Sequence, residues 1–363
     1  MSRIKVAMLC GGKSAEHEVS LQSAKNVVAA IDKKKYELIV IGIAKDGRWF
    51  RYEPTNFLQN RDDPVKVRLA ADGVPVALIP GEHGAELVNL LNLKPVEKVE
   101  VVFPILHGTY GEDGTIQGLL KLAGVPFVGA GVLGSAVGMD KDLLKHLLKE
   151  AAIPTAKFLV YHRNEPVDFA GVTATLGLPL FVKPANLGSS VGISKVKEKT
   201  QFDPAIREAL RYDSKILIEE FIAGREIECS VLGNETVTAS LPGEIIPHHE
   251  FYSYAAKYLD ANGASLDIPA QLPEPVVKQV QALAIKTFQV LGCEGMARVD
   301  FFLKKNGELY VNELNTIPGF TQISMYPKLW EASGLSYSNL IDKLIQLALE
   351  RFEREQRLKT SFV

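Results

Sequence analysis

The amino-acid sequence predicts an α/β N-terminal domain with a parallel sheet, followed by two α+β subdomains. Strand-like and helix-like segments alternate over the first 130 residues or so, which favours a parallel sheet covered by helices. From about residue 155 strand-like runs dominate with little helix between them, which indicates antiparallel or mixed sheets. A chain of 363 residues is also too long for one ordinary core. We expect domains at 1–128, 129–222 and 223–363.

The N-terminal domain is expected to begin with a strand, a helix and a second strand. The apolar run "IKVAML" (4–9) is typical of a buried parallel strand. Apolar residues then recur at helical spacing in residues 20–31. Apolar runs at 36–44 and 99–106 predict two more strands, and the less regular residues 51–98 predict insertions.

The rest of the chain is expected to be rich in strands. These are predicted at 156–162, 178–185, 191–197, 215–222, 225–233, 295–303 and 308–315. Helices are predicted after the N-cap candidate Asp140, at about 273–291 and at about 336–358.

The composition is that of a soluble globular protein, with 47% hydrophobic residues, 23% charged residues and a net charge of -2. No basic stripe is visible, so nucleic acid is not expected as the main partner. The sequence shows neither a signal-peptide core nor an apolar run of membrane-spanning length, so no membrane partner is expected. Cys10, Cys229 and Cys293 lie far apart in apolar contexts, which predicts reduced core cysteines in a cytoplasmic protein.

The segment "GGKSAEHE" (11–18) follows the first predicted strand, where nucleotide-binding turns often occur. It has neither the glycine spacing of dinucleotide sites nor that of a P-loop. A small anion could still bind at such a helix N-terminus. Glu16 would lie in the crevice at the carboxyl end of the strand, where an acid could bind the ammonium of a small substrate. Glu16 could equally be only a helix cap.

A second glycine-rich segment, "HGTYGEDG" (107–114), follows the strand predicted at 99–106. Its glycines permit tight turns at the same edge of the sheet. His107 could contact a substrate there, although a single histidine is more often structural.

The most informative segment is the run "GMARVDFFLKKNGELYVNELN". The dipeptide at 306–307 is a strong signal for a two-residue hairpin turn, which would place Lys305 opposite Glu308. Counting outward in the same register places Asp300 opposite Glu313.

This register also pairs Arg298 with Asn315, on the face that carries the two acids. The opposite face is the better core candidate and would carry Val299, Phe301, Leu303, Tyr310, Asn312 and Leu314. Two carboxylates directly opposite each other destabilise a sheet unless something compensates them. A divalent cation held by Asp300, Glu313 and Asn315 would do so, and such oxygen ligands suit Mg²⁺. The alternative is a solvated polar face.

The segment at 180–197 places Lys183 at the end of an apolar strand, before a loop of glycines and serines at 187–191. The N–H groups and hydroxyls of such a loop can close over phosphates, with the lysine as a point charge. A flexible surface hairpin is the alternative. The following segment at 219–224 could supply backbone contacts to a purine base, with Glu226 near a ribose.

Taken together, these segments resemble the D-alanine–D-alanine ligase family of the ATP-grasp superfamily over nearly the whole chain. The motifs that carry the resemblance are, in order, "GGKSAEHEVS", "HGTYGEDG", "MDKDLLK", "VKPANLGSSVGISKV", "EFYSYAAKY", "GMARVDFFL" and "VNELNTIPGFTQISMYP". Each motif is only moderately specific, but their joint presence in this order is highly specific. The resemblance implies that the two C-terminal subdomains form an ATP-grasp fold.

The resemblance implies a role for each matching residue. Glu16 matches the acid that binds the first ammonium, with Ser189 and Tyr258 as its hydrogen-bonded partners. The matching nucleotide contacts are Lys141 and Lys183 for phosphates, Lys257 for the nucleotide, Glu219, Glu220 and Ile222 for adenine, and Glu226 for ribose. The other matches are Asp300, Glu313 and Asn315 for metal, Arg298 and the Gly319 N–H for the tetrahedral intermediate, Ser324 with Met325 for the second carboxylate, and His107 for substrate. Some relatives have lysine in place of Glu220, which leaves the role of that side chain open.

The implied activity is the ATP-dependent ligation of two D-alanines through an acylphosphate, for peptidoglycan precursor synthesis in the cytoplasm. ATP is the co-substrate, and the implied cofactor is a pair of Mg²⁺ ions, with Mn²⁺ as an alternative. A homodimer is the implied assembly. The segments at 250–258 and 187–191 are candidates for a lid that keeps water from the acylphosphate.

Three other functions fit parts of the sequence. The first is an ATP-grasp ligase for different small amino acids, which would have the same fold and ATP site. The second is a nucleotide sensor without catalysis, which would lack metal ligands or lysines, and none is missing here. The third is a dinucleotide-dependent dehydrogenase, which the absent glycine fingerprint disfavours.

Overall fold

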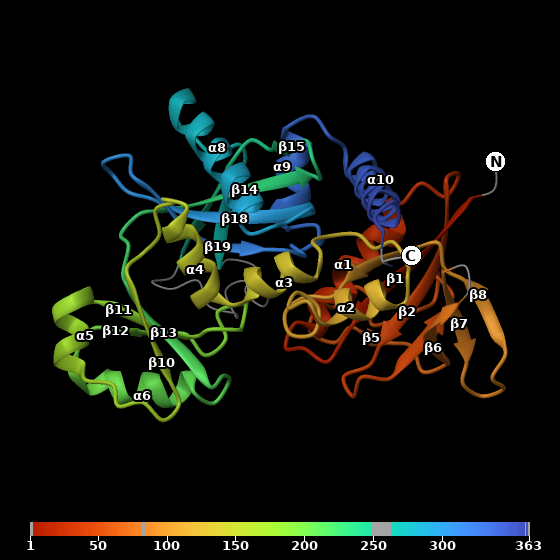
Figure 1. Ribbon diagram of the computed structural model, residues 1–363, viewed down its shortest axis with the longest axis horizontal. Coiled ribbons are helices and arrows are strands. Elements are labelled where there is room, and N and C mark those ends of the chain that lie inside the picture. The colour runs from red at the N-terminus through yellow and green to blue at the C-terminus, as the bar shows by residue number, and fades with distance from the viewer. Residues whose placement is uncertain (1–2, 82–83, 249–262, 360, 362–363) are drawn as a thin grey trace.

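The computed structural model describes residues 3–81, 84–248, 263–359 and 361, and Figure 1 shows their arrangement. The described residues form three large sheets and one small two-stranded sheet, β4 (Leu58–Gln59) with β5 (Arg68–Leu69). The predicted fold class is confirmed: an α/β domain with parallel strands precedes two α+β parts.

The N-terminal sheet has seven strands in the order β8-β7-β6-β3-β2-β1-β9. Their bounds are β1 Ile4–Gly11, β2 Tyr36–Ile43, β3 Trp49–Tyr52, β6 Val74–Gly81, β7 Gly84–Asn89, β8 Pro95–Lys98 and β9 Val101–Ile105. Only β1, β2 and β9 pair in parallel. The segment predicted as insertions forms β3, β6, β7 and β8, which extend the sheet by antiparallel pairing.

Strand β1 is buried on both faces, as its uninterrupted apolar run requires. Met8 and Cys10 point into one core with α1 (His17–Ala30), whereas Leu9 points into a second core with α2 (Thr115–Leu122). The three cysteines are buried and unpaired, as predicted.

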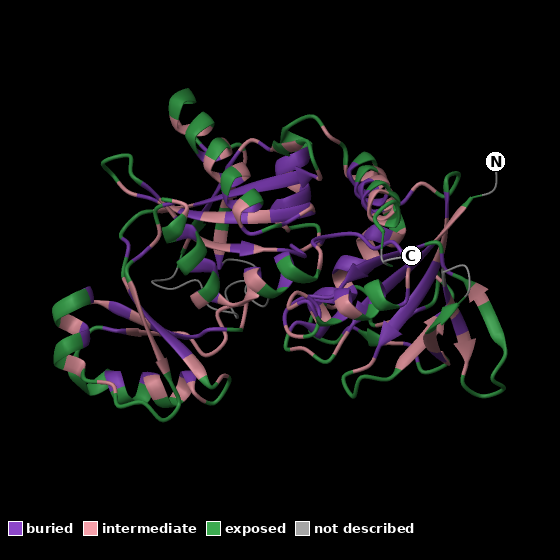
Figure 2. Cartoon of the chain, viewed as in Figure 1, coloured by how far each residue is buried: buried purple, intermediate pink, exposed green. Residues whose placement is uncertain are grey.

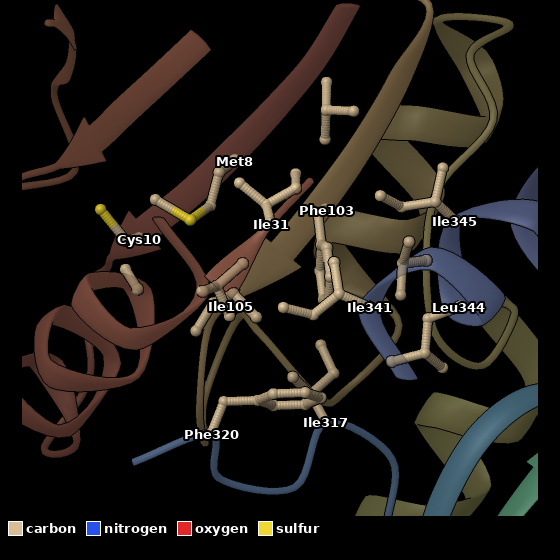
Figure 3. Packing of buried hydrophobic residues seen from close by; sticks show 14 of the residues in the cluster. Met8, Cys10, Ile31, Phe103, Ile105, Ile317, Phe320, Ile341, Leu344 and Ile345 are labelled. Atoms are coloured by element: carbon tan, nitrogen blue, oxygen red, sulfur yellow. The ribbon is translucent and has the colours of Figure 1, made fainter. Parts of the chain in front are cut away.

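The first of these cores also contains the C-terminal helix α10 (Tyr337–Gln356) and the loop that carries Ile317 and Phe320. Figure 3 shows Ile317 and Phe320 pointing toward Phe103 and Ile341. The ring of Phe103 lies edge-on to that of Phe320, with centroids 5.9 Å apart. Residues from the end of the chain are therefore held against the N-terminal sheet.

The middle sheet is antiparallel, with strands in the order β10-β13-β11-β12. Its elements are β10 Phe158–His162, β11 Leu180–Pro184, β12 Ser194–Val196, β13 Lys215–Glu220, α5 Phe169–Leu176 and α6 Lys199–Ala209. The expectation of little helix here was wrong. Helix α5 has only eight residues, and α6 has Pro204 in its middle, which obscures the helical pattern in the sequence.

The third sheet runs β17-β16-β14-β18-β19, with β15 beside β14, and all its pairs are antiparallel. Its strands are β14 Arg225–Gly233, β15 Val237–Ala239, β16 Gly243–Pro247, β17 Ala264–Asp267, β18 Gly295–Leu303 and β19 Leu309–Asn315. Helices α4 (Lys141–Glu150) and α8 (Glu274–Val290) pack into its core, and α9 (Met325–Ala332) contacts β14.

Helix α4 lies between the middle sheet and the third sheet in Figure 1, after α3 (Val132–Met139). The predicted N-cap is confirmed, because the Asp140 carboxylate accepts the N–H groups of Asp142 and Leu143 at 3.1 and 3.2 Å. Figure 2 shows that burial is concentrated in the sheets, while the outer sides of α5 and α8 are exposed.

Each large sheet falls within one predicted domain, and we therefore propose the division at 1–128, 129–222 and 223–363. Within the described ranges, no helix is both long and apolar enough to cross a bilayer.

Candidate active site

Strands β18 and β19 bring the predicted polar residues together. Asp300 faces Glu313 and Arg298 faces Asn315, as the sequence predicted. All four are only half-buried, whereas Val299 between the two β18 residues is fully buried. The polar face is therefore partly open to solvent, and the apolar face borders the core.

The turn and the strand pairing that produce this register differ from those predicted. The turn has three residues instead of two, because Lys304 N–H donates to the Glu308 carbonyl at 2.9 Å and Gly307 has the left-handed φ of 87°. This shifts the register by one residue. A β-bulge that leaves Asn312 without a partner opposite shifts it back before Asp300.

The bulge changes which residues of β19 face the core. The sequence pattern predicted Tyr310 and Asn312 on the apolar face with Leu314. The buried residues are instead Leu309, Val311 and Leu314, and Tyr310 and Asn312 are half-buried. An inserted residue moves side chains to the other face, so that part of the prediction was wrong.

The Arg298 guanidinium lies between two carboxylates. Its Nε and Nη2 each lie 2.7 Å from an oxygen of Asp300, and Nε lies 2.8 Å from Glu228 Oε2. Burial lowers the pKa of Arg298, but Asp300 and Glu228 raise it more, so it lies well above its usual value. Glu228 faces Asp300 from β14 and was not predicted. Its only signal was an acid inside the apolar run "REIECSVLG".

The donor atoms of Asp300, Glu313 and Asn315 fit a hard divalent cation. They offer carboxylate and carboxamide oxygens from adjacent strands, which is the chemistry that Mg²⁺ prefers. Asp300 also accepts a hydrogen bond from Asn315 Nδ2 at 3.0 Å.

Lys141 connects this acidic face to the glycine loop of the middle sheet. Its Nζ donates to the Leu187 carbonyl at 2.6 Å and lies 3.9 Å from Glu313 Oε2. Its backbone N–H bonds to the carbonyl of Ala185 at 3.0 Å. The predicted phosphate lysine is therefore at the meeting point of the two sheets.

The nucleotide residues predicted on the middle sheet also come together. Lys183 Nζ lies 2.5 Å from Glu219 Oε2, and both side chains are buried. The Glu220 carboxylate accepts the N–H of Lys157 on the adjacent chain segment at 2.8 Å, which gives its side chain a structural role. Ile222 is buried.

Glu16 and Ser189, predicted from distant segments, are in contact: the Ser189 hydroxyl donates to the Glu16 carboxylate. Glu16 stands at the N-cap position of α1, but its side chain makes no capping bond within the described part of the helix. A cavity of about 350 Å³ lies beside the pair. Its lining includes Lys13, Ser14, Glu16, Gly108, Gly188 and Tyr212. This position favours substrate binding over helix capping for Glu16.

His107 is buried, and both ring nitrogens are engaged inside the protein. Nδ1 lies 2.9 Å from the Ile317 carbonyl and Nε2 lies 3.0 Å from the Ser23 hydroxyl. Burial lowers its pKa, with Glu16 opposing that shift. These contacts favour the structural alternative for His107 over a direct substrate contact.

Glu112 ties the segment after His107 to the same loop, and the sequence did not single it out. Its two carboxylate oxygens accept the N–H groups of Gly108 and Ile317, each at 2.9 Å. Loss of water around the carboxyl group, with the nearby Glu16 carboxylate, raises the pKa of Glu112 to about 8.

The backbone next to Gly319 is held firmly. Phe320 N–H donates to the Ser23 hydroxyl at 3.1 Å, and the Phe320 carbonyl accepts from Tyr337 at 2.7 Å and Asn26 at 3.1 Å. A Cβ added at Gly319 would lie 2.6 Å from the Ser324 hydroxyl oxygen. Glycine at this position therefore permits the close approach of Ser324.

Ser324 and Met325 mark the start of α9. The Ser324 hydroxyl accepts the Thr321 N–H at 2.9 Å. The Met325 side chain is buried against Ile245 and Leu329, so only its backbone N–H is suited to a ligand. The N–H groups of a helix N-terminus favour a carboxylate.

Four predictions concern other positions. Glu226 lies on β14 two residues from Glu228, so both are on one face of the strand. Lys257, Tyr258 and the lid candidate 250–258 lie outside the described residues.

Comparisons with known proteins identify the family of this chain. Residues 5–130 match the D-ala D-ala ligase N-terminus family, and residues 147–346 match the D-ala D-ala ligase C-terminus family. The D-alanine–D-alanine ligase of Shouchella clausii (strain KSM-K16) is 54% identical over 99% of this chain and 99% of its own length. D-alanine–D-alanine ligase A of Salmonella typhimurium (strain LT2) is 52% identical over 99% of this chain and 100% of its own.

Solved structures show the same likeness. The D-alanine–D-alanine ligase from Coxiella burnetii has a TM-score of 0.88 and 43% identity, covering 98% of this chain and 97% of that one. The VanG D-Ala:D-Ser ligase from Enterococcus faecalis has a TM-score of 0.84 and 39% identity, covering 96% of this chain and 100% of that one. The chain therefore belongs to the D-alanine–D-alanine ligase family of ATP-dependent ligases, which have the ATP-grasp fold.

Proposed function

We propose that the protein joins two D-alanines into D-alanyl-D-alanine with ATP, through an acylphosphate, and so supplies a peptidoglycan precursor. One observation carries the proposal: Lys141 links the glycine loop to the facing acids Asp300 and Glu313. In this proposal Lys141 is the phosphate-binding cation, the neighbouring loop covers the phosphates and the acids are oxygen ligands, which together meet the needs of phosphoryl transfer.

A carboxylate must first be activated, because it has no good leaving group. Transfer of the γ-phosphoryl group of ATP to the carboxylate of the first D-alanine gives an acylphosphate and ADP. Positioning and charge neutralisation account for most of the catalysis in such transfers. We assign the positioning to Lys141, Lys183 and the loop at 187–191.

We assign Asp300, Glu313 and Asn315 as the residues that would hold two Mg²⁺ ions, or Mn²⁺ in their place. When bound, these ions neutralise charge on the phosphates. Glu219, Glu220, Ile222 and Glu226, with Lys257, are the proposed contacts of the adenosine part of ATP.

Glu16 is the proposed binding group for the ammonium of the first D-alanine. Ser189 holds its carboxylate from the glycine loop, so closing that loop also completes the substrate site. We propose Tyr258 as a further partner of this pair.

The second D-alanine loses a proton from its ammonium group, and the resulting amine attacks the carbonyl carbon of the acylphosphate to form a tetrahedral oxyanion. This collapses by breaking the bond from carbon to the phosphate oxygen, which releases phosphate, and the nitrogen loses a second proton to give the amide. Arg298 and the Gly319 N–H are the proposed donors to that oxyanion. Losing one donor of this kind typically costs roughly 10²–10³ in rate. Ser324 and the Met325 N–H are the proposed site for the carboxylate of the second substrate.

The VanG D-Ala:D-Ser ligase has nearly the same fold, so the fold does not identify the second substrate. We propose D-alanine because relatives with higher sequence identity are D-alanine–D-alanine ligases. The fold alone thus leaves the choice of nucleophile to local residues. We further propose a homodimer in the cytoplasm without nucleic-acid or membrane partners, as in the family that the sequence resembles.

The direct test measures ADP release with ATP, Mg²⁺ and D-alanine, with the product identified by mass. D-Serine, D-lactate and a panel of L-amino acids are assayed in parallel. D-Alanine-dependent ADP release with formation of the dipeptide supports the proposal. ADP release that requires another amino acid would reassign the substrate, and no release with any of them would reject ligase activity.

A further inference from the structure

Lys145 is a fully buried lysine to which the proposed reaction assigns no role. It lies on α4, one helical turn after Lys141 and on the same side of the helix. A lysine at 0% exposure is unusual and needs a partner for its charge.

The partner is Glu219, the carboxylate that also binds Lys183. Lys145 Nζ lies 3.2 Å from Glu219 Oε1, whereas Lys183 Nζ lies 2.5 Å from Glu219 Oε2. Lys145 also donates to the Thr155 hydroxyl at 2.9 Å, and that hydroxyl donates to the Val311 carbonyl at 3.0 Å. One buried carboxylate is therefore shared by two lysines.

The charges of this cluster do not cancel. Burial raises the pKa of Glu219, but Lys145 and then Lys183 lower it more, so its net pKa lies below the usual value and it is ionised at neutral pH. Burial lowers the pKa of Lys145, and Glu219 opposes that shift. With both lysines protonated, two ammonium groups and one carboxylate leave one positive charge. Lys145 is 0% exposed, whereas Lys183 is 6% exposed and lies one residue before the end of β11, so Lys183 is the lysine that can turn toward a ligand.

We propose that Lys145 is a positioning residue for nucleotide binding: it neutralises Glu219 and so leaves Lys183 available to the phosphates of ATP. Removing one partner of a buried ion pair is strongly unfavourable, because the other charge is left uncompensated. With Lys145 in place, Glu219 keeps a partner when Lys183 moves to a phosphate. Without it, Lys183 would be retained by Glu219. This inference rests on the nucleotide site of the proposed function.

The test measures nucleotide binding to the full chain. It compares the wild type with Lys145→Met, because methionine has a side chain of similar length without the charge. Calorimetric titrations compare ADP with Mg²⁺ against adenosine, which has no phosphates. The expected result is a loss of about tenfold or more in ADP affinity, with adenosine affinity within about twofold of wild type. Lys149→Met, the same change at an exposed position of α4, should bind both ligands as wild type does.

Two results would overturn the proposal. Unchanged ADP affinity in Lys145→Met would show that Glu219 does not compete for Lys183. An equal loss of ADP and adenosine would show that Lys145 only shapes the pocket.

If Lys145→Met does not fold, a second comparison tests the proposal in a variant without the Glu219 carboxylate. In a Glu219→Gln background no carboxylate competes for Lys183, so adding Lys145→Met should change ADP affinity by less than about twofold. A further large loss in the double variant would contradict the proposal. These titrations require no turnover, so absence of D-alanine ligation in the wild type would reject the proposed function without deciding the role of Lys145.

Discussion

The Nε2 atom of His107 lies 3.0 Å from the hydroxyl oxygen of Ser23, and the same hydroxyl accepts the N–H of Phe320 at 3.1 Å. A neutral imidazole with its hydrogen on Nδ1 satisfies every contact: it donates to the Ile317 carbonyl and accepts from Ser23. These bonds connect α1 to both sides of the loop segment that contains Gly319. The N–H proposed to stabilise the oxyanion is therefore positioned by the N-terminal domain.

Ser23→Ala should loosen this connection. The Phe320 N–H and His107 Nε2 would each lose a buried partner, at a cost of about 1–3 kcal/mol per group. We expect a lower melting temperature and a kcat reduced about tenfold or more, with KM for ATP nearly unchanged. Thermal denaturation and steady-state kinetics measure both effects.

The matched control is Ser214→Ala, at an exposed serine of the middle domain, which should behave as wild type. A Ser23→Ala enzyme with normal kcat and stability would show that the loop is positioned without this hydroxyl.

His107 should make the protein sensitive to acid. Burial lowers its pKa below the usual 6.5, so the folded protein keeps it neutral in a range where the unfolded chain binds a proton. Because the unfolded state binds more protons there, stability is lost as the pH falls below about 6.5. The titration of Glu112, near pH 8, lies outside this range.

Replacing His107 by Asn removes the titrating group. The melting temperature of His107→Asn should therefore depend less on pH between 7 and 5 than that of the wild type, although the variant is less stable at pH 7. His162→Asn, at an exposed histidine, should keep the wild-type dependence. Parallel curves for His107→Asn and wild type would contradict a depressed pKa in the folded state.

The facing acids should be indispensable for turnover and not for folding. Asp300→Asn and Glu313→Gln each remove a charge from the proposed metal site, and we expect activity to fall by at least about 10²-fold. The two acids face each other, so losing one also reduces repulsion. Asp300→Asn in addition loses the ion pair with Arg298, which keeps Glu228 as a partner, so both variants should remain folded and Asp300→Asn should have the lower melting temperature. ADP release and thermal denaturation test this together.

Glu308→Gln is the control on the same hairpin, because Glu308 is exposed near the turn. Removing divalent cations with a chelator should abolish wild-type activity, and added Mg²⁺ should restore it. Normal turnover in either acid variant would reject the metal assignment.

The hairpin also shows how far the sequence could predict the site. The pairing of Asp300 with Glu313 was correct although the turn length was wrong, because the bulge at Asn312 cancelled the error. Neither deviation has a distinct sequence signal. The dipeptide Asn-Gly occurs both in two-residue turns and in three-residue turns with glycine in the left-handed conformation. A polar residue is also as compatible with a bulge as with a regular strand.

The long, strongly patterned elements were predictable, and the partners of charged residues were not. The apolar runs of β1, β2 and β9 identified the parallel strands directly. Glu228 lies on a mostly apolar strand and Lys145 on a helix with several other charges, and only the packing of other strands shows which charges they neutralise. Such contacts join distant segments of the chain, and the periodicity of apolar residues within one segment does not predict them.

Gly108→Ala should disturb the first substrate site through the position of Glu16. Gly108 has a left-handed φ of 71°, and a Cβ there would lie 2.5 Å from Glu16 Oε2 and 2.9 Å from Ser14 Oγ. The backbone strain alone costs about 1–2 kcal/mol, and the contact must push the carboxylate away from Ser189. We expect KM for the first D-alanine to rise about tenfold or more while KM for ATP changes little. Gly118→Ala in α2 is the control, because no atom of the described structure lies within 4 Å of the position of the added Cβ. Alanine in place of glycine also stabilises a helix by up to about 1 kcal/mol. If Gly108→Ala used D-alanine as the wild type does, the Glu16 carboxylate would not be the group that binds the first ammonium.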